Sequence, residues 1–483
     1  MLTHRVIIST PVYLSHRSPK SSASIPSTNL TSTRTDSMMK LTTGILMVSS
    51  TLFHLAYAGN QRFHPQNLFV KMKAGEAMAE SKLIKSSENI IGDIYLVKTN
   101  NLKALEAELS ESAKIEYVQK DFYGARENTL KHEVLDPIQV SISSAHTKNF
   151  NMFNDPGVSK LWSFGDTAGM NVTSAYASLP PFILEDVIVA VVDTGVDHTH
   201  EDLKDVMWTN TAEIPGDRID NDRNGYIDDI HGINTLIRDT NRNATMNTMP
   251  SFQGGGDYHG THVAGTIAAT QNNNIGLAGV ASNAKIMAIR TVPDAADELD
   301  SDIVEAFKYA ANMGAKVINC SFGKKVNEEG MIVRDVINEI ANSHGVLVVA
   351  AAGNDSKNID ALPTYPASFD SESMLVVAAS TASGGLASFS NTGKISVDVA
   401  APGSNIYSTL PGNEYGPLSG TSMAAPNTAG VAAMVRGYFP HLSPAQVKQV
   451  IMDSVTQVSR FRNAVSTGGR VNLQTALQKA SEI

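Results

Sequence analysis

Apolar and amphipathic segments alternate over the last two thirds of the chain. Runs that are apolar on both faces are typical of strands buried in a parallel sheet. Six runs have this pattern: EDVIVAVVDTG, AKIMAIRTV, AKVINCSFG, GVLVVAAAGN, MLVVAAS and ISVDVAAPG. The segments between them space their apolar residues as helices do, as in SDIVEAFKYAANMG and SPAQVKQVIMDSV. The alternation predicts an α/β domain over residues 158–483, with helices on both faces of a mainly parallel central sheet.

The helix predicted near residues 301–314 has polar residues at its expected start and a glycine at its expected end. Asp302 and Glu305 can form a capping box, and Gly314 can end the helix. The domain should bind its ligands at the carboxyl ends of the strands.

Residues 59–130 have a different pattern. A strand-like NLFVKMK is followed by a helix-like LKALEAELSE and a strand-like IEYVQKDFYG, which predicts a small α+β unit. Residues 131–157 are polar and weakly patterned, which is typical of a linker or an exposed cleavage region.

The first 58 residues read as an export signal behind an extension. Residues 38–58 contain Lys40, an apolar run and the small-x-small end Ala56-Tyr57-Ala58, which predicts a signal peptide cleaved after Ala58. The run is too short for a stable membrane span, and a buried core helix is the alternative. Residues 1–37 are rich in Ser and Thr, and we expect them to be non-native or disordered, with translation starting at Met38 or Met39.

Composition limits the possible partners and stabilising devices. The 483 residues carry a formal net charge of −10, which argues against a nucleic acid partner. The single cysteine, Cys320, cannot form an intramolecular disulfide, so an exported chain would need another way to rigidify its loops.

Four polar residues lie at predicted element ends beside glycines. Asp193 and Asn354 follow buried strands, whereas His259 and Ser422 precede helices rich in small residues. Each could be a turn or capping residue when taken singly. Together they predict a catalytic group at one edge of the sheet.

The motifs DTGVD, HGTHVAGT, AAGN and GTSMAAP, in this order, resemble those of the subtilisin-like serine proteases, over about residues 155–478. The resemblance implies a three-layer α/β/α fold and a serine endopeptidase. Ser422 would attack the peptide carbonyl, His259 would act as its base, and Asp193 would orient His259. Asn354 and the Ser422 N–H would stabilise the oxyanion.

The resemblance also implies a substrate groove for polypeptides, with a broad preference for apolar or aromatic side chains. One wall would be formed by Ser321, Phe322 and Gly323, and the other by Ala351, Ala352 and Gly353. Residues 59–130 resemble the inhibitory prosegment of this family. We therefore expect a secreted monomer that cleaves off its own prosegment between Gly124 and Phe150.

The segment DRIDNDRNGYIDDIHG begins like a calcium-binding loop. The predicted ligands are Asp220, Asp222, Asn224, the Tyr226 carbonyl and Asp228. The loop departs from the usual pattern at its twelfth position, where His231 replaces a bidentate glutamate, and a solvated acidic turn is the alternative. The family resemblance implies a second structural calcium site at Asp202 and Asn273.

Two other functions remain possible from these motifs. The His-x-His pair of His198 and His200 could begin the metal site of an amidohydrolase, with His259 and His262 as further ligands. An inactive binding protein on the same fold is the other alternative, although every catalytic position is filled.

Overall fold

The computed structural model describes residues 63–78, 80–123, 152–238, 244–245, 248–249, 258–293, 298–324 and 330–483. These residues belong to one compact unit, Arg62–Ile483. The predicted extension 1–37, the predicted signal peptide 38–58 and most of the predicted cleavage region 131–157 lie outside the described residues.

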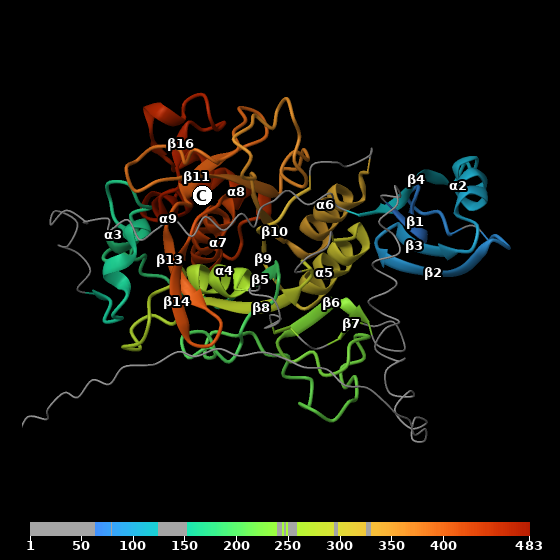
Figure 1. The fold of residues 1–483 in the computed structure, drawn as a ribbon, viewed down its shortest axis with the longest axis horizontal. Coiled ribbons are helices and arrows are strands. Elements are labelled where there is room, and N and C mark those ends of the chain that lie inside the picture. The colour runs from blue at the N-terminus through green and yellow to red at the C-terminus, as the bar shows by residue number, and fades with distance from the viewer. Residues whose placement is uncertain are drawn as a thin grey trace, which may run out of the picture. The chain divides into compact units, whose positions relative to one another are not determined.

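A ten-stranded sheet forms the centre of the larger part (Figure 1), and its order is β15-β16-β12-β11-β10-β9-β5-β8-β6-β7. Neighbours from β16 to β6 pair in parallel, and the end pairs β15–β16 and β6–β7 are antiparallel. The strands are β5 (Val187–Asp193), β6 (Gly232–Arg238), β7 (Ala244–Thr245), β8 (Ala284–Arg290), β9 (Val317–Cys320), β10 (Leu347–Ala351), β11 (Met374–Ser380), β12 (Val399–Pro402), β15 (Thr456–Gln457) and β16 (Gly469–Arg470). The predicted mainly parallel sheet is confirmed.

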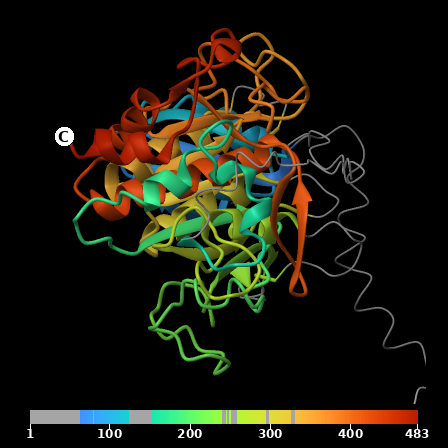
Figure 2. The ribbon, with the colours of Figure 1, turned by 90° about the vertical axis from the view of Figure 1, so that its left-hand side faces the viewer.

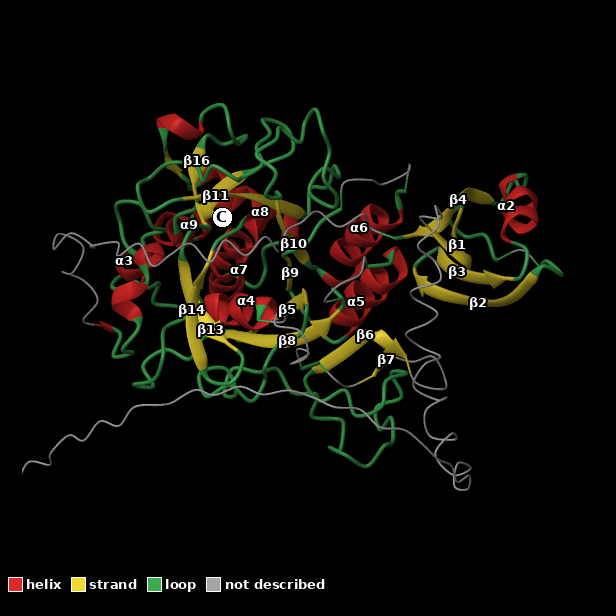
Figure 3. Ribbon diagram, viewed as in Figure 1, coloured by secondary structure: helices red, strands yellow, loops and turns green. Residues whose placement is uncertain are grey.

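Helices cover both faces of this sheet (Figures 1 and 3). One face carries α3 (Val172–Tyr176), α4 (His259–Ala268), α7 (Thr421–Tyr438), α8 (Pro444–Asp453) and α9 (Leu473–Ala480), and the other carries α5 (Asp300–Asn312) and α6 (Ile332–His344). Each face of the sheet packs against its own helices in a separate apolar core. In strand β5, Val189 and Val191 belong to the core with α4 and α7, whereas Ala190 and Val192 belong to the core with α5 and α6, so the strand is apolar on both faces. The result is the predicted three-layer α/β/α fold.

Helix α7 is buried along its whole length. A helix that is apolar all round belongs inside a core, and the small residues of TSMAAPNTAGVAA let α7 lie close to the sheet. Next to α4, β13 (Ile406–Leu410) and β14 (Glu414–Leu418) form an antiparallel hairpin, drawn in orange in Figure 2. The described residues also include short 3-10 helices at Val158–Lys160, Trp162–Phe164 and Ser459–Phe461.

The N-terminal segment has its own antiparallel sheet, with the order β2-β3-β1-β4 (Figure 1, blue). Its elements are β1 (Phe63–Met72), β2 (Ile84–Ile91), β3 (Ile94–Thr99), α2 (Leu102–Ser110) and β4 (Ile115–Phe122). Strands β1 and β4 and helix α2 cover the three segments whose patterns predicted a strand, a strand and a helix. The β2–β3 hairpin was not predicted, because most of β2 is polar and exposed.

The start of α5 differs from its prediction. The helix begins at Asp300, so Asp302 lies inside the first turn and the Asp302–Glu305 capping box is wrong. The Ser301 backbone N–H instead donates to Asp121 Oδ1 of the N-terminal segment, at 3.0 Å. A cap from a distant part of the chain cannot be recognised from local sequence.

Candidate active site

The four residues that were predicted from element ends form two contacting groups: Asp193 with His259, and Asn354 with the start of the helix that carries Ser422. Asp193 is the last residue of β5, and Asn354 follows the end of β10. His259 is the first residue of α4, and Ser422 is the second residue of α7.

Asp193 and His259 form a buried pair. His259 Nδ1 lies 2.7 Å from Asp193 Oδ1, which also accepts the Thr194 N–H at 2.7 Å. Gly260 permits this contact, because a Cβ there would lie 2.1 Å from the Gly195 carbonyl oxygen. Asp193 therefore fixes the His259 proton on Nδ1 and leaves Nε2 as the basic nitrogen.

Ser422 lies against the segment that follows β9. Its hydroxyl donates to the Ser321 carbonyl oxygen at 3.1 Å, and the Ser321 hydroxyl donates to the Ser422 carbonyl oxygen at 2.9 Å. Within the described part of the chain, the Ser422 hydroxyl thus bonds Ser321 and not His259. Nucleophile–base hydrogen bonds are often long or misaligned before substrate binds.

Two hydrogen-bond donors face the space beside Gly420. A Cβ on Gly420 would lie 3.5 Å from the Ser422 backbone nitrogen and 3.6 Å from Asn354 Nδ2. Because glycine has no side chain, this space stays open, and both donors can reach one oxygen there. The arrangement suits a developing oxyanion.

Thr421 fixes the Asn354 amide, and sequence reasoning missed this residue. Asn354 Oδ1 accepts both the Thr421 N–H, at 2.8 Å, and the Thr421 hydroxyl, at 3.0 Å. The same hydroxyl accepts the Gly353 N–H at 3.0 Å. The carbonyl end of the amide is thereby held, which directs Nδ2 towards Gly420. The signal was present in GTSMAAP, where Thr421 directly precedes the serine.

The residues predicted to bind substrate lie on both sides of Ser422. Ser321, Phe322 and Gly323 continue from β9 and are buried. The next residue, Lys324, exchanges two backbone hydrogen bonds of 2.8 Å with Tyr365. On the other side, β10 ends in the second predicted set, Ala351, Ala352 and Gly353, which is also buried. Their contact with a substrate stays a prediction.

The acid-rich loop gathers three carboxylates. Single carboxylate oxygens of Glu213, Asp220 and Asp222 lie within 4.8 Å of one another. None of the three pairs with a lysine or arginine among the residues that the structure describes. Their oxygens accept N–H groups of the loop, as Glu213 Oε1 accepts those of Asn221 and Asp222 at 2.7 and 3.1 Å. Close carboxylates without a cationic partner still repel one another, and an all-oxygen donor set suits calcium, so these residues fit the ion. Sequence reasoning missed Glu213, because it precedes the motif by several residues and only the local excess of acids pointed to it.

The other predicted ligands of this loop have additional partners. Asn224 Nδ2 donates to Asp222 Oδ2 at 3.1 Å, and its Oδ1 accepts the Tyr226 N–H at 2.8 Å. Asp228 is buried and accepts the backbone N–H groups of Gly216 and Arg218, at 2.7 and 3.1 Å. Asp228 therefore shapes the loop backbone.

The second predicted calcium pair also meets in space. Asn273 Nδ2 donates to Asp202 Oδ1 at 2.8 Å, and the Leu277 N–H donates to Asp202 Oδ2 at 2.9 Å. Burial raises the pKa of Asp202 to about 6. This predicted pair contains one carboxylate, whereas three gather at the acid-rich loop, so its fit to a cation is weaker.

The histidines of the amidohydrolase alternative do not form one site. His200 Nε2 lies 3.2 Å from the Glu414 carbonyl oxygen, and its Nδ1 accepts the Asp202 N–H at 3.1 Å. His262 is buried, with Nε2 2.8 Å from the Ile406 carbonyl oxygen. Both nitrogen atoms of His200 are engaged by backbone groups, so His200 is not free to ligate a metal. Among the described residues, no group of three metal-ligating side chains includes these histidines.

Among the helices that the structure describes, none combines the length and the apolar character that a membrane crossing requires.

Comparison with known proteins gives one family. The family model described as the subtilase family, Peptidase S8, matches residues 185–471. The chain is 35% identical over 292 residues to thermitase of Thermoactinomyces vulgaris, covering 60% of this chain and 88% of thermitase. A solved protease structure from Pseudoalteromonas arctica matches with a TM-score of 0.53 and 28% identity, covering 68% of this chain and 99% of that one.

Longer relatives are also similar to this chain. Subtilisin-like protease 1 of Plasmodium berghei is 29% identical over 433 residues, covering 85% of this chain and 67% of the relative. Halolysin-like extracellular serine protease Nep of Natrialba magadii is 30% identical over 409 residues, covering 84% and 65%. The chain thus spans about two thirds of these relatives, and 43% of further Plasmodium proteases.

Proposed function

Because the chain belongs to the subtilase family of serine-type endopeptidases, we propose that it hydrolyses peptide bonds through Asp193, His259 and Ser422. The observations that carry the proposal are the 2.7 Å contact between His259 Nδ1 and Asp193 Oδ1 and the position of Ser422 at the start of a buried helix. The amidohydrolase alternative does not fit the family or the histidine contacts, and an inactive binding protein does not fit the filled catalytic positions.

The reaction follows from the roles of these groups. Ser422 Oγ attacks the carbonyl carbon of the scissile bond while His259 Nε2 takes its proton. Asp193 stabilises the resulting imidazolium, and Asn354 Nδ2 and the Ser422 N–H donate to the oxyanion. His259 then gives the proton to the departing amine, which leaves an acyl group on Ser422. A water molecule, deprotonated by His259, hydrolyses this ester and restores the serine.

We also propose that the N-terminal segment, residues 59–130, is the inhibitory prosegment and is removed by the enzyme itself. Its strand β4 provides acceptors for two helix starts of the peptidase. Asp121 accepts the Ser301 N–H of α5 at 3.0 Å, and Gln119 Oε1 accepts the N–H groups of Met331 and Ile332 at α6, at 2.7 and 2.9 Å. These bonds satisfy backbone groups that a helix leaves free at its start.

An apolar contact supports the same docking. Phe69, Ile90, Ile91 and Ile94 of the segment belong to the apolar core that α5 and α6 share. The opposite side of β1, with Leu68 and Val70, faces α2 in a separate core. The small sheet therefore buries one face in its own core and one face on the peptidase.

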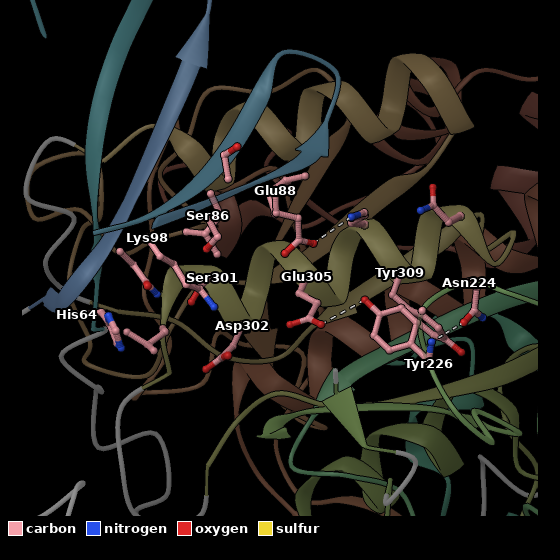
Figure 4. Close-up of a pocket in the computed structure, with 18 of the residues that line it drawn as sticks. His64, Ser86, Glu88, Lys98, Asn224, Tyr226, Ser301, Asp302, Glu305 and Tyr309 are labelled. Carbon is pink, nitrogen blue, oxygen red and sulfur yellow. Dashed lines mark hydrogen bonds and ion pairs between the residues drawn. The ribbon is translucent and has the colours of Figure 1, made fainter. Parts of the chain in front are cut away.

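The docking is incomplete next to this contact. A cavity of about 740 Å³ lies between β2–β3, α5 and the acid-rich loop (Figure 4). On its margins, Lys308 Nζ lies 3.6 Å from Glu88 Oε1, and the Tyr226 hydroxyl donates to Glu305 Oε1 at 3.2 Å. An interface that leaves such a cavity is weaker than a fully packed one of the same area, which suits a segment that must be released.

Three further proposals complete the function. A calcium ion at Glu213, Asp220 and Asp222 would neutralise their charges and hold together a loop that no disulfide can close. Secretion is supported by the signal pattern at residues 38–58 and by a relative whose name includes "extracellular". The chain would act on polypeptides as a monomer.

The test combines labelling with loss of the nucleophile. A fluorophosphonate should label the purified protein on Ser422, and Ser422→Ala should abolish both labelling and casein hydrolysis. N-terminal sequencing should find the Ser422→Ala chain uncut between residues 124 and 150. The proposal fails if the variant digests casein at the parent rate. Normal cutting in the variant would overturn self-processing alone.

A further inference from the structure

His198 and His231 face each other outside the proposed active site. Their ring centroids are 4.8 Å apart, with an angle of 39° between the ring planes. His198 lies in the turn that follows β5, and His231 directly precedes β6. Neither residue has a role in the proposed peptidase chemistry.

The hydrogen bonds of the pair define its free nitrogen atoms. His231 Nδ1 lies 2.9 Å from the Trp208 carbonyl oxygen. A carbonyl only accepts, so Nδ1 carries the proton and Nε2 keeps its lone pair. His198 Nδ1 is buried, and it has no hydrogen-bond partner among the residues that the structure describes.

The surroundings of His198 favour its neutral form. Burial, and secondarily the neighbouring His231, lower the pKa of His198 below its usual value. The one charge recorded with the opposite effect is that of Asp197, whose two carboxylate oxygens already accept hydrogen bonds from Thr199 and from the Gly412 N–H. A neutral imidazole is the form that binds metals.

We propose that His198 and His231 bind one transition-metal ion of the zinc type, with water completing its coordination. Two imidazole nitrogens about 2.0–2.1 Å from one tetrahedral zinc ion place their ring centres about 5 Å apart. The observed 4.8 Å agrees with this spacing. The hydrogen bond from His231 Nδ1 to a backbone carbonyl is also the usual arrangement around a metal-bound histidine.

This site is chemically distinct from the acid-rich loop. Calcium takes oxygen ligands, whereas imidazole suits zinc, copper and nickel. The two positions are nevertheless linked by the chain, because Trp208 and His231 bracket the loop and the Asn210 N–H donates to the Ile230 carbonyl oxygen at 2.8 Å across its base. An ion on His231 and His198 would tie the base of the loop to the turn that follows Asp193. The expected effect is higher stability.

The test measures metal binding directly and does not depend on proteolysis. The full chain carrying Ser422→Ala, saturated with Ca²⁺, is titrated with Zn²⁺ by calorimetry and with Co²⁺ by its visible absorption. His198→Gln and His231→Gln are compared with His441→Gln, an exposed histidine that serves as the matched control. We expect one Zn²⁺ per chain at this site, a zinc-dependent rise in Tm, and an affinity loss of about tenfold or more in either site variant. The control variant should match the parent.

The proposal is overturned if both site variants bind zinc as the parent does, or if the parent binds none. His259 is the competing zinc ligand, so the difference between variants decides the outcome. His231→Gln could weaken the fold through its bond to Trp208, and Tm without zinc would show this. His198→Gln breaks no described hydrogen bond, so a parent-like zinc response in that folded variant alone rejects the site.

Discussion

Replacing Thr421 by valine would remove one hydroxyl group beside the proposed oxyanion site. The side chain is fully buried, and valine has nearly the same shape, with a methyl group in place of the hydroxyl. Two hydrogen bonds disappear: the one donated to Asn354 Oδ1 and the one accepted from the Gly353 N–H. The Thr421 N–H still donates to Asn354 Oδ1 at 2.8 Å, so the amide keeps one of its two anchors.

The effect on turnover can be bounded from these contacts. Removing an oxyanion donor outright lowers kcat about 10²–10³-fold, a magnitude established on a member of this same family. Thr421→Val leaves Asn354 in place with a looser amide, so we expect about a tenfold loss in kcat and a KM within about twofold of the parent. The buried Gly353 N–H loses its partner, which should lower the free energy of unfolding by about 1–3 kcal/mol.

The assay compares three enzymes with a soluble peptide anilide, after titration of active sites with a fluorophosphonate. Thr421→Ser keeps the hydroxyl and should retain kcat within about threefold of the parent, whereas Asn354→Ala should lose the full donor effect. A folded Thr421→Val enzyme with parental kcat would refute the positioning role. A higher KM at unchanged kcat would point to substrate binding. A loss in the serine variant without a loss in the valine variant would point to packing of the methyl group.

Three other changes test separate parts of the structure. Asp121→Ala should lower the free energy of unfolding of the uncut Ser422→Ala chain by about 1.5–3 kcal/mol, measured in urea, because Ser301 loses its buried acceptor. An unchanged urea midpoint would show that Asp121 does not stabilise the start of α5. Excess chelator should lower the Tm of the parent more than that of Glu213→Gln, because an ion at a hundredfold excess over its Kd adds about 2.7 kcal/mol to the free energy of unfolding. Equal shifts in Tm would reject Glu213 as a ligand. Burial lowers the pKa of His262 from 6.5 to about 3. Between these pH values the unfolded chain therefore binds one proton more than the folded chain. The free energy of unfolding should fall as pH falls from 6.5 towards 3, by up to about 1.4 kcal/mol per pH unit. His262→Gln should flatten that slope in acid-unfolding curves, and a slope equal to the parent's would show that other groups control it.

Patterns that repeat within a short stretch predicted most of the fold. Buried parallel strands are apolar on both faces, so their runs stand out in the sequence and identify the sheet. The polar residue that ends such a run is equally visible, and this is why Asp193 and Asn354 could be assigned to one edge. Strand β2 was missed for the opposite reason, because most of its residues are exposed and polar and it is held by pairing with β3.

Contacts between distant segments could not be predicted. The α5 cap depends on Asp121, which is far away in sequence, so the local pair Asp302 and Glu305 offered a plausible but wrong answer. Glu213 joins Asp220 and Asp222 only through the path of the loop. In the same way, nothing in the local sequence separates His198 from its neighbour His200, which the backbone holds, whereas His198 faces His231.

The contacts of the docked N-terminal segment, which we propose to be a prosegment, would assist folding of the peptidase. While Asp121 and Gln119 are in place, the first backbone N–H groups of α5 and α6 have partners and the apolar side of both helices is covered. Without the segment, these N–H groups can hydrogen-bond only with water, so the peptidase alone should nucleate α5 and α6 less readily. Asp300 and Asp302 in the first turn of α5 still favour the positive end of that helix after release. A folded peptidase can therefore persist without the segment, although forming it should be faster with the segment present, because a sheet built from distant strands is slow to assemble.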